Sequence, residues 1–192
     1  MKKVGVLALQ GDFEAHGKAL ERAGAEPVYV RTAADLAGLD GLVIPGGEST
    51  TMLKLLRGEA LLGPLSEFGR RKPVFGTCAG AILLASEVSN PAQESLCLMD
   101  LAVERNAYGR QIDSRVTRIT PDPEFISRTY GGDLEAVFIR APIIRRVGEG
   151  VHVLAAYNGA PVLVEQGPHL VATFHPELTT DPRVHTLFVS KL

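Results

Sequence analysis

The chain has 192 residues, of which 45% are hydrophobic, so it can bury a core without disulfides or a metal, and we expect one domain over residues 1–192. Its formal net charge of −2 argues against nucleic acid or an anionic membrane surface as a partner, and no apolar run approaches the roughly 18 residues of a membrane span. The two cysteines, Cys78 and Cys97, do not form a disulfide framework, so the predicted compartment is the cytoplasm.

Short apolar runs alternate with stretches of helical periodicity in the first half of the chain. Strands are predicted at residues 4–9, 27–30, 42–44 and 74–75. Helices are predicted at residues 13–23, in two stretches between 50 and 71 that separate near Gly63 and Pro64, and at 79–85, where a further helix opens. This alternation indicates an α/β fold with an open, mostly parallel central sheet flanked by helices.

After about Asn90 the pattern changes to β-like segments in close succession. They cover residues 103–119, 135–147, 151–157 and 160–174, with a tight connection at 167–169. We therefore expect antiparallel strands to be added in the C-terminal half. A closing helix is predicted at residues 181–192, with Asp181 as its N-cap and Pro182 at its first position.

Cys78 lies in the sequence GTCAG (76–80), between a predicted strand and a predicted helix. Small residues on both sides of a nucleophile permit a sharp strand-to-helix turn that lifts the side chain clear of the sheet. The N-terminus of the following helix favours the thiolate form of a cysteine. A cysteine that only packs in the core is the alternative. Cys97 has no such setting and is predicted to be a core or loop residue.

A nucleophilic thiol needs a base, and the best candidate is His175, which ends an apolar run and precedes Pro176 and Glu177. Because the proline disfavours helix at His175, residues 175 and 177 can project to the same side of an extended segment. Glu177 could then bind one ring nitrogen while the other faces the thiol. Packing or surface roles are predicted for the other four histidines: His16, which has helical spacing with Phe13, Leu20 and Ala23, and His152, His169 and His185.

A glycine pair lies in the segment LVIPGGESTTM (42–52), where a predicted strand leads into residues that can cap a helix. At the carboxyl end of a strand, glycine N–H groups can face a ligand. The N–H of Gly47, together with that of Ala79, would form an oxyanion hole. An ordinary capped loop is the alternative. A phosphate loop is disfavoured because its motif is absent, and no metal site is predicted.

Six stretches that cover nearly the whole chain carry a resemblance to a known family. They are GVLALQGD (5–12), PGGESTTM (45–52), FGTCAGAILLA (75–85), LMDLAVERNAYGRQIDS (98–114), VFIRAPII (137–144) and FHPELTTDPRVH (174–185). In this order they resemble the class I, triad-type glutamine amidotransferases, and among them the glutaminase subunits of pyridoxal 5′-phosphate synthases. The resemblance implies the flavodoxin-like fold of class I glutamine amidotransferases.

The resemblance also implies a reaction. Cys78 attacks the carboxamide carbon of L-glutamine, forms a thioester and releases ammonia, while His175 acts as the base and Glu177 orients it. The family's contacts with glutamine fall on six residues: Gly47, Glu48, Ser49, Arg105, Ile139 and Arg140. No cofactor is implied.

The implied partner is a separate synthase subunit, a (β/α)8 barrel that receives the ammonia within a hetero-oligomeric complex and builds pyridoxal 5′-phosphate. We expect the isolated glutaminase to be nearly silent until it docks, because the peptide between Gly46 and Gly47 must adopt the oxyanion-hole orientation.

Three other interpretations stay open: a cysteine hydrolase of another α/β family, a glutaminase that feeds a different acceptor, and a docking subunit without catalysis. The hydrolase order places the acid before the histidine, whereas Glu177 follows His175. The chain departs from the family's pattern at Ala15, where glutamate is common, and at Cys97 and Ala136, where glycine is usual. None of these positions belongs to the proposed triad.

Overall fold

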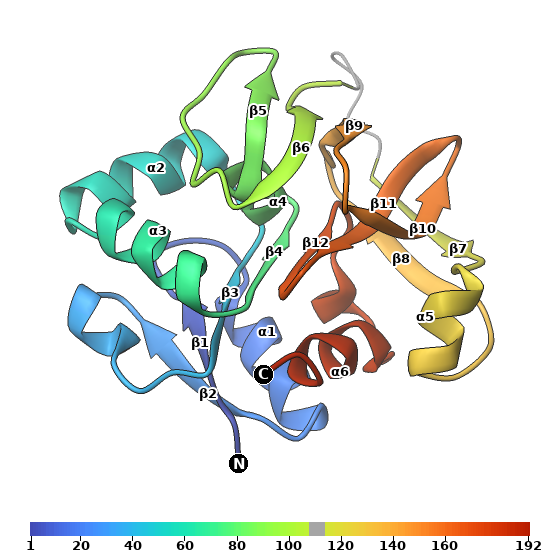
Figure 1. Cartoon of the computed structure of the whole chain (residues 1–192), viewed down its shortest axis with the longest axis horizontal. Coiled ribbons are helices and arrows are strands. Elements are labelled where there is room, and N and C mark those ends of the chain that lie inside the picture. Colours follow the sequence, from blue (N-terminus) through green and yellow to red (C-terminus); the bar gives the residue numbers. More distant parts are fainter. Residues whose placement is uncertain (108–113) are drawn as a thin grey trace.

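A computed structural model describes residues 1–107 and 114–192, so part of the predicted segment at 103–119 and of the quoted stretch at 98–114 lies outside the described residues. The central sheet has seven strands: β1 (Lys3–Leu7), β2 (Glu26–Val30), β3 (Gly41–Ile44), β4 (Val74–Thr77), β10 (His152–Tyr157), β11 (Ala160–Gln166) and β12 (His169–Ala172). Their order across the sheet is β10-β11-β12-β4-β3-β1-β2 (Figure 1).

The sheet combines a parallel part with an antiparallel edge. Strands β12, β4, β3, β1 and β2 pair in parallel, whereas β10 and β11 add antiparallel strands beside β12. The five parallel strands, numbered in chain order, lie in the order 2-1-3-4-5, which is the flavodoxin-like arrangement. The predicted fold class is confirmed.

Two small sheets flank the central one. The first contains β5 (Ala85–Ser89), β6 (Met99–Glu104) and β9 (Ile143–Val147), and the second contains β7 (Arg115–Ile119) and β8 (Leu134–Phe138). The predicted antiparallel additions are therefore present, although β5 and β6 pair in parallel.

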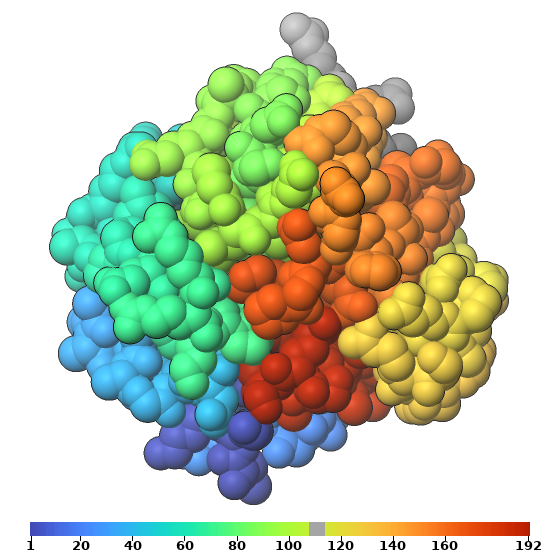
Figure 2. Space-filling model, in the orientation of Figure 1, coloured from blue at the N-terminus to red at the C-terminus, as the bar shows by residue number. Residues whose placement is uncertain are grey.

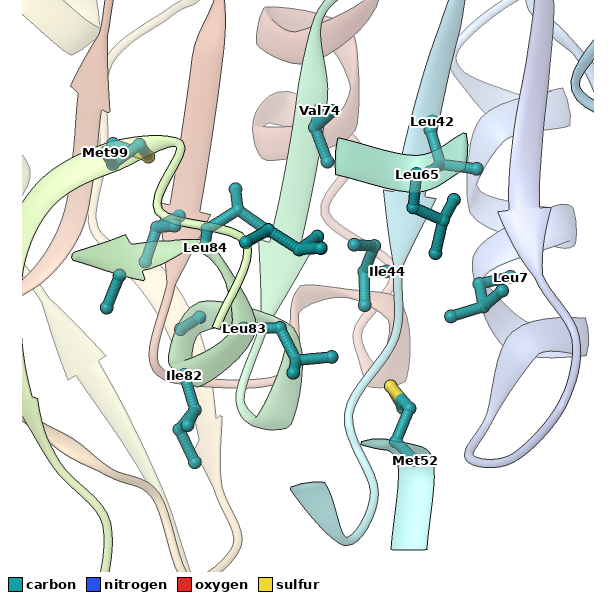
Figure 3. Close-up of a cluster of buried hydrophobic side chains, with 14 of the residues drawn as sticks. Leu7, Leu42, Ile44, Met52, Leu65, Val74, Ile82, Leu83, Leu84 and Met99 are labelled. Carbon is teal, nitrogen blue, oxygen red and sulfur yellow. The ribbon is translucent and has the colours of Figure 1, made fainter. Parts of the chain in front are cut away.

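Helices cover both faces of the central sheet. They are α1 (Phe13–Arg22), α2 (Ser49–Gly58), α3 (Leu62–Arg71), α4 (Ala79–Leu84), α5 (Pro123–Arg128) and α6 (Arg183–Val189), with 3₁₀ turns η1 (Ala33–Leu36) and η2 (Pro176–Leu178). Leu42 and Ile44 of β3 face the cluster that includes side chains of α2, α3 and α4 (Figure 3). Val43, between them, faces the cluster with α1 and α6.

This double coverage explains why the strands read as unbroken apolar runs. All residues of β3, and all residues of β1 except Lys3, are buried, since each strand has a helical layer on both sides. Each fully buried Leu or Ile stabilises the fold by about 1.5–3 kcal/mol.

Predicted helix boundaries are wrong at the break between α2 and α3 and at both ends of α6, which ends at Val189 and not at residue 192. The break between α2 and α3 falls at residues 59–61, and Pro64 lies in the first turn of α3, where a missing N–H costs no intrahelical hydrogen bond. Helix α6 begins at Arg183, with Pro182 instead of Asp181 at the N-cap. The Asp181 carboxylate nevertheless accepts the Arg183 N–H at 3.0 Å and also binds the Arg183 guanidinium.

The two halves of the chain meet where β12 pairs with β4. In the space-filling view, green residues of the first half lie directly against orange and red residues of the second (Figure 2). This pairing brings the segment after β12 next to the segment after β4. No helix among the described residues has both the length and the hydrophobicity of a membrane-spanning segment.

Candidate active site

The parallel strands end at one edge of the sheet, and the segments that leave them converge there. Gly11 follows β1, Gly46 follows β3, Cys78 follows β4 and His175 follows β12. All four line a pocket of about 320 Å³. Open α/β sheets bind small molecules at this edge, and the pocket volume is at the lower end of the range for such sites, about 300–1,000 Å³.

Cys78 forms the predicted turn between a strand and a helix. Its φ of 50° and ψ of −105° are unusual for a residue with a side chain and cost about 1–3 kcal/mol, which the surrounding structure must offset. The glycines at 76 and 80 are required sterically: a Cβ on Gly76 would lie 2.6 Å from the Gly80 carbonyl, and one on Gly80 would lie 2.1 Å from the Ile44 carbonyl oxygen. The thiol is largely buried but lines the pocket, so Cys78 has access to a bound ligand.

His175 and Glu177 make the predicted contact. Nδ1 of His175 lies 2.7 Å from Oε1 of Glu177, and both side chains are buried. The backbone differs from the predicted extended segment, because residues 176–178 form the 3₁₀ turn η2, in which the Leu178 N–H donates to the His175 carbonyl oxygen. Pro176 suits the first position of such a turn.

The imidazole of His175 lies beside Cys78. A Cβ placed on Gly46 would be 2.5 Å from His175 Cε1 and 3.2 Å from Cys78 Cβ, so both side chains flank the same glycine. Burial disfavours the charged imidazole, but hydrogen bonds with Cys78 and Glu177, together with their charges, outweigh it and raise the pKa of His175 to about 10.

The loop after β3 packs tightly against the loop after β1. A Cβ on Gly11 would lie 1.9 Å from the Gly46 carbonyl oxygen, and one on Gly47 would lie 2.9 Å from Oε1 of Gln10. The same Gln10 oxygen accepts the Glu48 N–H at 3.1 Å. Gly47 has a φ of 140°, which favours glycine at this position.

Glu48 caps helix α2 and orients Arg105. Its Oε2 accepts the Thr51 N–H at 3.0 Å and the Thr51 hydroxyl at 2.7 Å. These hydrogen bonds and the nearby Arg105 lower the pKa of Glu48. Nη2 of Arg105 donates to Thr50 Oγ1 at 2.6 Å and lies 3.9 Å from Glu48 Oε1. The guanidinium is therefore fixed at the pocket wall.

The remaining predicted contacts come from two other segments. The Ser49 hydroxyl donates to Oε1 of Gln93 at 3.1 Å, so its own oxygen stays available as an acceptor. Ile139 and Arg140 follow β8, and the Ile139 carbonyl oxygen lies 3.9 Å from Cys78 Sγ. Arg140 has a positive φ of 43°, an uncommon conformation that often occurs at functional sites.

Sequence reasoning found most of the pocket. Every predicted site residue except Glu177, which lies behind His175, lines it: Gly47, Glu48, Ser49, Cys78, Ala79, Arg105, Ile139, Arg140 and His175. The pocket also includes residues that were not predicted: Gly11, Asp12, Ile82, Asn106, Pro142 and Leu178. Gly11 and Asp12 lie in the loop that connects the first strand to the first helix, so their position after a strand was a signal that could have found them.

A second group missed by sequence reasoning lies on the core side of Glu177. His16 and His185 are fully buried, and Nδ1 of His16 lies 3.0 Å from Nε2 of His185. Nε2 of His16 lies 3.0 Å from Thr77 Oγ1 and 3.4 Å from Glu177 Oε2. Burial is the main cause that lowers the pKa of both imidazoles, that of His185 to about 3. Both histidines are therefore neutral at pH 7.

No group of three or more His, Cys, Asp or Glu side chains that could hold a metal ion occurs in the part of the chain that the structure describes.

Comparisons with known proteins agree with this geometry. A protein from Solibacter usitatus named pyridoxal 5′-phosphate synthase subunit PdxT is 69% identical over 192 residues, which is 100% of both chains. One of the same name from Koribacter versatilis is 57% identical over 187 residues, 97% of this chain and 94% of its own. A solved structure described as a glutamine amidotransferase has a TM-score of 0.87 and 47% identity and covers 98% of this chain and 97% of its own.

Two further results bear on the fold and the family. The structure of PurLQS from Thermotoga maritima, at 16% identity and a TM-score of 0.77, shares the fold and covers 98% of both chains. The family described as the SNO glutamine amidotransferase family matches residues 6–192. The chain belongs to the SNO glutamine amidotransferase family.

Proposed function

We propose that this chain hydrolyses L-glutamine to L-glutamate and ammonia with Cys78, His175 and Glu177 as its catalytic triad. The observation that carries the proposal is the 2.7 Å contact between His175 and Glu177, next to a cysteine in a strained turn that faces a pocket. A nucleophile, a base and an orienting carboxylate are the elements that acyl transfer requires. Membership in a glutamine amidotransferase family supports the choice of glutamine.

In the first half-reaction, the Cys78 thiolate attacks the carboxamide carbon of glutamine. The carbonyl oxygen becomes an oxyanion, for which we assign the N–H groups of Gly47 and Ala79 as donors. As the first residue of α4, Ala79 has an N–H without an intrahelical acceptor. One such donor is worth about 2.7–4 kcal/mol in the transition state. The C–N bond then breaks, the protonated His175 gives its proton to the leaving nitrogen, and ammonia leaves the thioester.

In the second half-reaction, water replaces the thiolate. His175, now neutral, takes a proton from the attacking water molecule, and a second oxyanion forms at the same donors. The C–S bond breaks, glutamate leaves, and the proton on His175 restores the starting pair with the Cys78 thiolate. The Glu177 carboxylate stabilises each imidazolium that forms.

The amino-acid end of glutamine would bind at the opposite wall of the pocket. Arg105 suits the substrate carboxylate, because a guanidinium can bind a carboxylate through two parallel hydrogen bonds and this one is already oriented by Thr50. We assign the other glutamine contacts to Gly47, Glu48, Ser49, Ile139 and Arg140. Since the Glu48 carboxylate caps α2, its side chain acts mainly by orienting Arg105.

The partner in this proposal is a pyridoxal 5′-phosphate synthase. Similar proteins carry the name of a subunit of that enzyme, at 69% and 57% identity. We propose that this chain is one glutaminase domain over residues 1–192 that passes ammonia in the cytoplasm to a synthase subunit with a (β/α)8 barrel, for the synthesis of vitamin B6.

The test is glutamine hydrolysis by the purified chain with and without the synthase of the same organism, together with detection of pyridoxal 5′-phosphate. We expect glutamate release to rise strongly on addition of the synthase and cofactor synthesis to follow with glutamine as the nitrogen source. Glutamate release without cofactor synthesis would indicate a different acceptor. No glutamate release under either condition would indicate a docking subunit and refute the proposed reaction.

A further inference from the structure

The two oxygens of the Glu177 carboxylate have different environments. Oε1 binds Nδ1 of His175 at 2.7 Å, whereas Oε2 is buried and has no aligned hydrogen-bond donor among the described residues. Nε2 of His16 lies 3.4 Å from Oε2. A carboxylate held at one oxygen can rotate, so a group at the other oxygen decides how well His175 is oriented.

The hydrogen-bonding partners of His16 indicate which of its ring nitrogens carries the proton. With the proton on Nε2, the N–H faces Thr77 Oγ1 and Glu177 Oε2, and Nδ1 accepts from Nε2–H of His185. In this arrangement the unpartnered Nδ1 of His185 carries a lone pair and not an N–H, and the nearby Glu177 Oε2 has no aligned donor.

The opposite tautomer, with the proton of His16 on Nδ1, is unfavourable both at Glu177 and at His185. A lone pair on Nε2 of His16 would face the carboxylate oxygen of Glu177 at 3.4 Å. His185 would then carry its proton on Nδ1, which is buried and has no acceptor. Because a buried N–H without a partner is rarer and costlier than a buried lone pair, the Nε2–H tautomer of His16 is favoured.

The surroundings of the two rings hold them in place. Phe75 of β4 packs edge-on against both, with ring centroids 6.2 Å from His16 and 5.6 Å from His185. His16 comes from α1, His185 from α6 and Glu177 from η2, so three elements that are distant in the sequence meet behind the pocket. None of the three residues lines the pocket, which separates them from the glutamine contacts.

We propose that His16 is a positioning residue for the triad: its Nε2–H fixes the free oxygen of Glu177, and His185 fixes the proton of His16 on that nitrogen. The order of contacts is Cys78, His175, Glu177, His16 and His185. This inference deepens the proposed glutaminase function and depends on it for the kinetic test alone.

The kinetic test compares His16→Leu with His16→Gln, each assayed with the synthase present. Leucine removes the donor, and we expect kcat to fall roughly 10- to 100-fold, as for other partners that orient a catalytic group, with KM for glutamine unchanged within about twofold. The glutamine side chain in His16→Gln keeps an N–H near the position of Nε2, so we expect this variant to recover most of kcat. His152→Gln, a change at an exposed histidine, is the matched control.

An equal fall in kcat in the leucine and glutamine variants would overturn the positioning role. A rise in KM without a fall in kcat would overturn it as well.

Two measurements do not depend on turnover. Nitrogen-15 NMR of the histidine rings should show His16 protonated on Nε2 and neutral at pH 7, and protonation on Nδ1 would overturn the proposal. Alkylation of Cys78 by iodoacetamide, in a Cys97→Ser background, should slow about threefold or more in His16→Leu and recover in His16→Gln. An unchanged rate in His16→Leu would contradict the proposal even if the chain proved not to hydrolyse glutamine.

Discussion

Glu177 separates two buried histidine sites with opposite electrostatics. On the pocket side, hydrogen bonds with Cys78 and Glu177 raise the pKa of His175 to about 10 despite its burial. On the core side, burial and the neighbouring histidines lower the pKa of His16, and burial lowers that of His185 to about 3. Burial disfavours the cation at all three rings, so the difference lies in the partners.

One carboxylate supports one imidazolium. The charge of Glu177 is paired with His175 through an aligned hydrogen bond, and its contact with His16 is longer and unaligned. In our proposal, the core side supplies neutral donors that orient Glu177, while the pocket side holds the proton that moves during catalysis. The experiments below break or sharpen this division, from the largest expected effect to the smallest.

Replacement of the nucleophile should have the largest effect. Cys78→Ala should reduce glutamine hydrolysis by about 1,000-fold or more in the presence of the synthase, because no other group can form the thioester. The measurement is glutamate release, with Cys97→Ser as the control that should keep normal activity, since Cys97 is exposed and lies outside the pocket. Near-normal turnover in Cys78→Ala would refute the assignment.

Loss of the pocket-side base should change the reactivity of the thiol. In His175→Asn the thiol of Cys78 loses the neighbouring imidazole that exchanges its proton. We expect iodoacetamide alkylation of Cys78 at pH 7 to slow roughly 10-fold.

The matched control is His152→Gln in the same Cys97→Ser background, which should alkylate like the parent chain. An unchanged rate in His175→Asn would show that the thiol is activated by the helix terminus alone.

The residues on the pocket side of Glu177 could be predicted from the sequence, because the motifs that indicate them are short and local. Gly76 and Gly80 bracket Cys78 within five residues, and Glu177 follows His175 by two. The rule that strands of an open sheet end at one edge then brings such segments together. The contact between His175 and Glu177 was predicted, although the backbone there forms a 3₁₀ turn and not the predicted extended segment.

The contacts on the core side of Glu177 could not be predicted in the same way. His16 meets Thr77 and His185, which are 61 and 169 residues away in the sequence, and no spacing rule links them. The available signal was a polar residue on the apolar stripe of a predicted helix, beside Leu20. Similarly, Cys97 is exposed and has a positive φ of 51°, and no local sequence pattern predicts that conformation.

Substrate binding should depend on the guanidinium at the pocket wall and not on the core side. Arg105→Lys keeps the charge but loses the paired donors, so we expect KM for glutamine to rise roughly tenfold with kcat changed less than about threefold. Steady-state kinetics with the synthase present measure both constants. A fall in kcat alone would place Arg105 in the chemical step instead of the binding of the carboxylate.

The smallest effect is an acid-dependent loss of stability on the core side. His16 and His185 have pKa values below the ordinary 6.5 in the folded chain, so only the unfolded chain takes up their protons as the pH falls. Their contribution to stability is present above pH 6.5 and is lost as the pH falls toward the folded pKa values. From about pH 6.5 to about pH 5.5, the His185 ring, with a folded pKa of about 3, should cost about 1 kcal/mol of unfolding free energy.

His185→Gln isolates this contribution, because glutamine can still donate to Nδ1 of His16 but does not titrate. Urea unfolding at the two pH values should therefore show a smaller loss in the variant than in the parent, by about 1 kcal/mol. His175 acts in the opposite sense: its raised pKa gives stability that is present below pH 6.5 and lost as the pH rises through about 10. Equal acid sensitivity in the parent and in His185→Gln would mean that this ring takes up a proton without unfolding, and the contrast between the two sides of Glu177 would not hold.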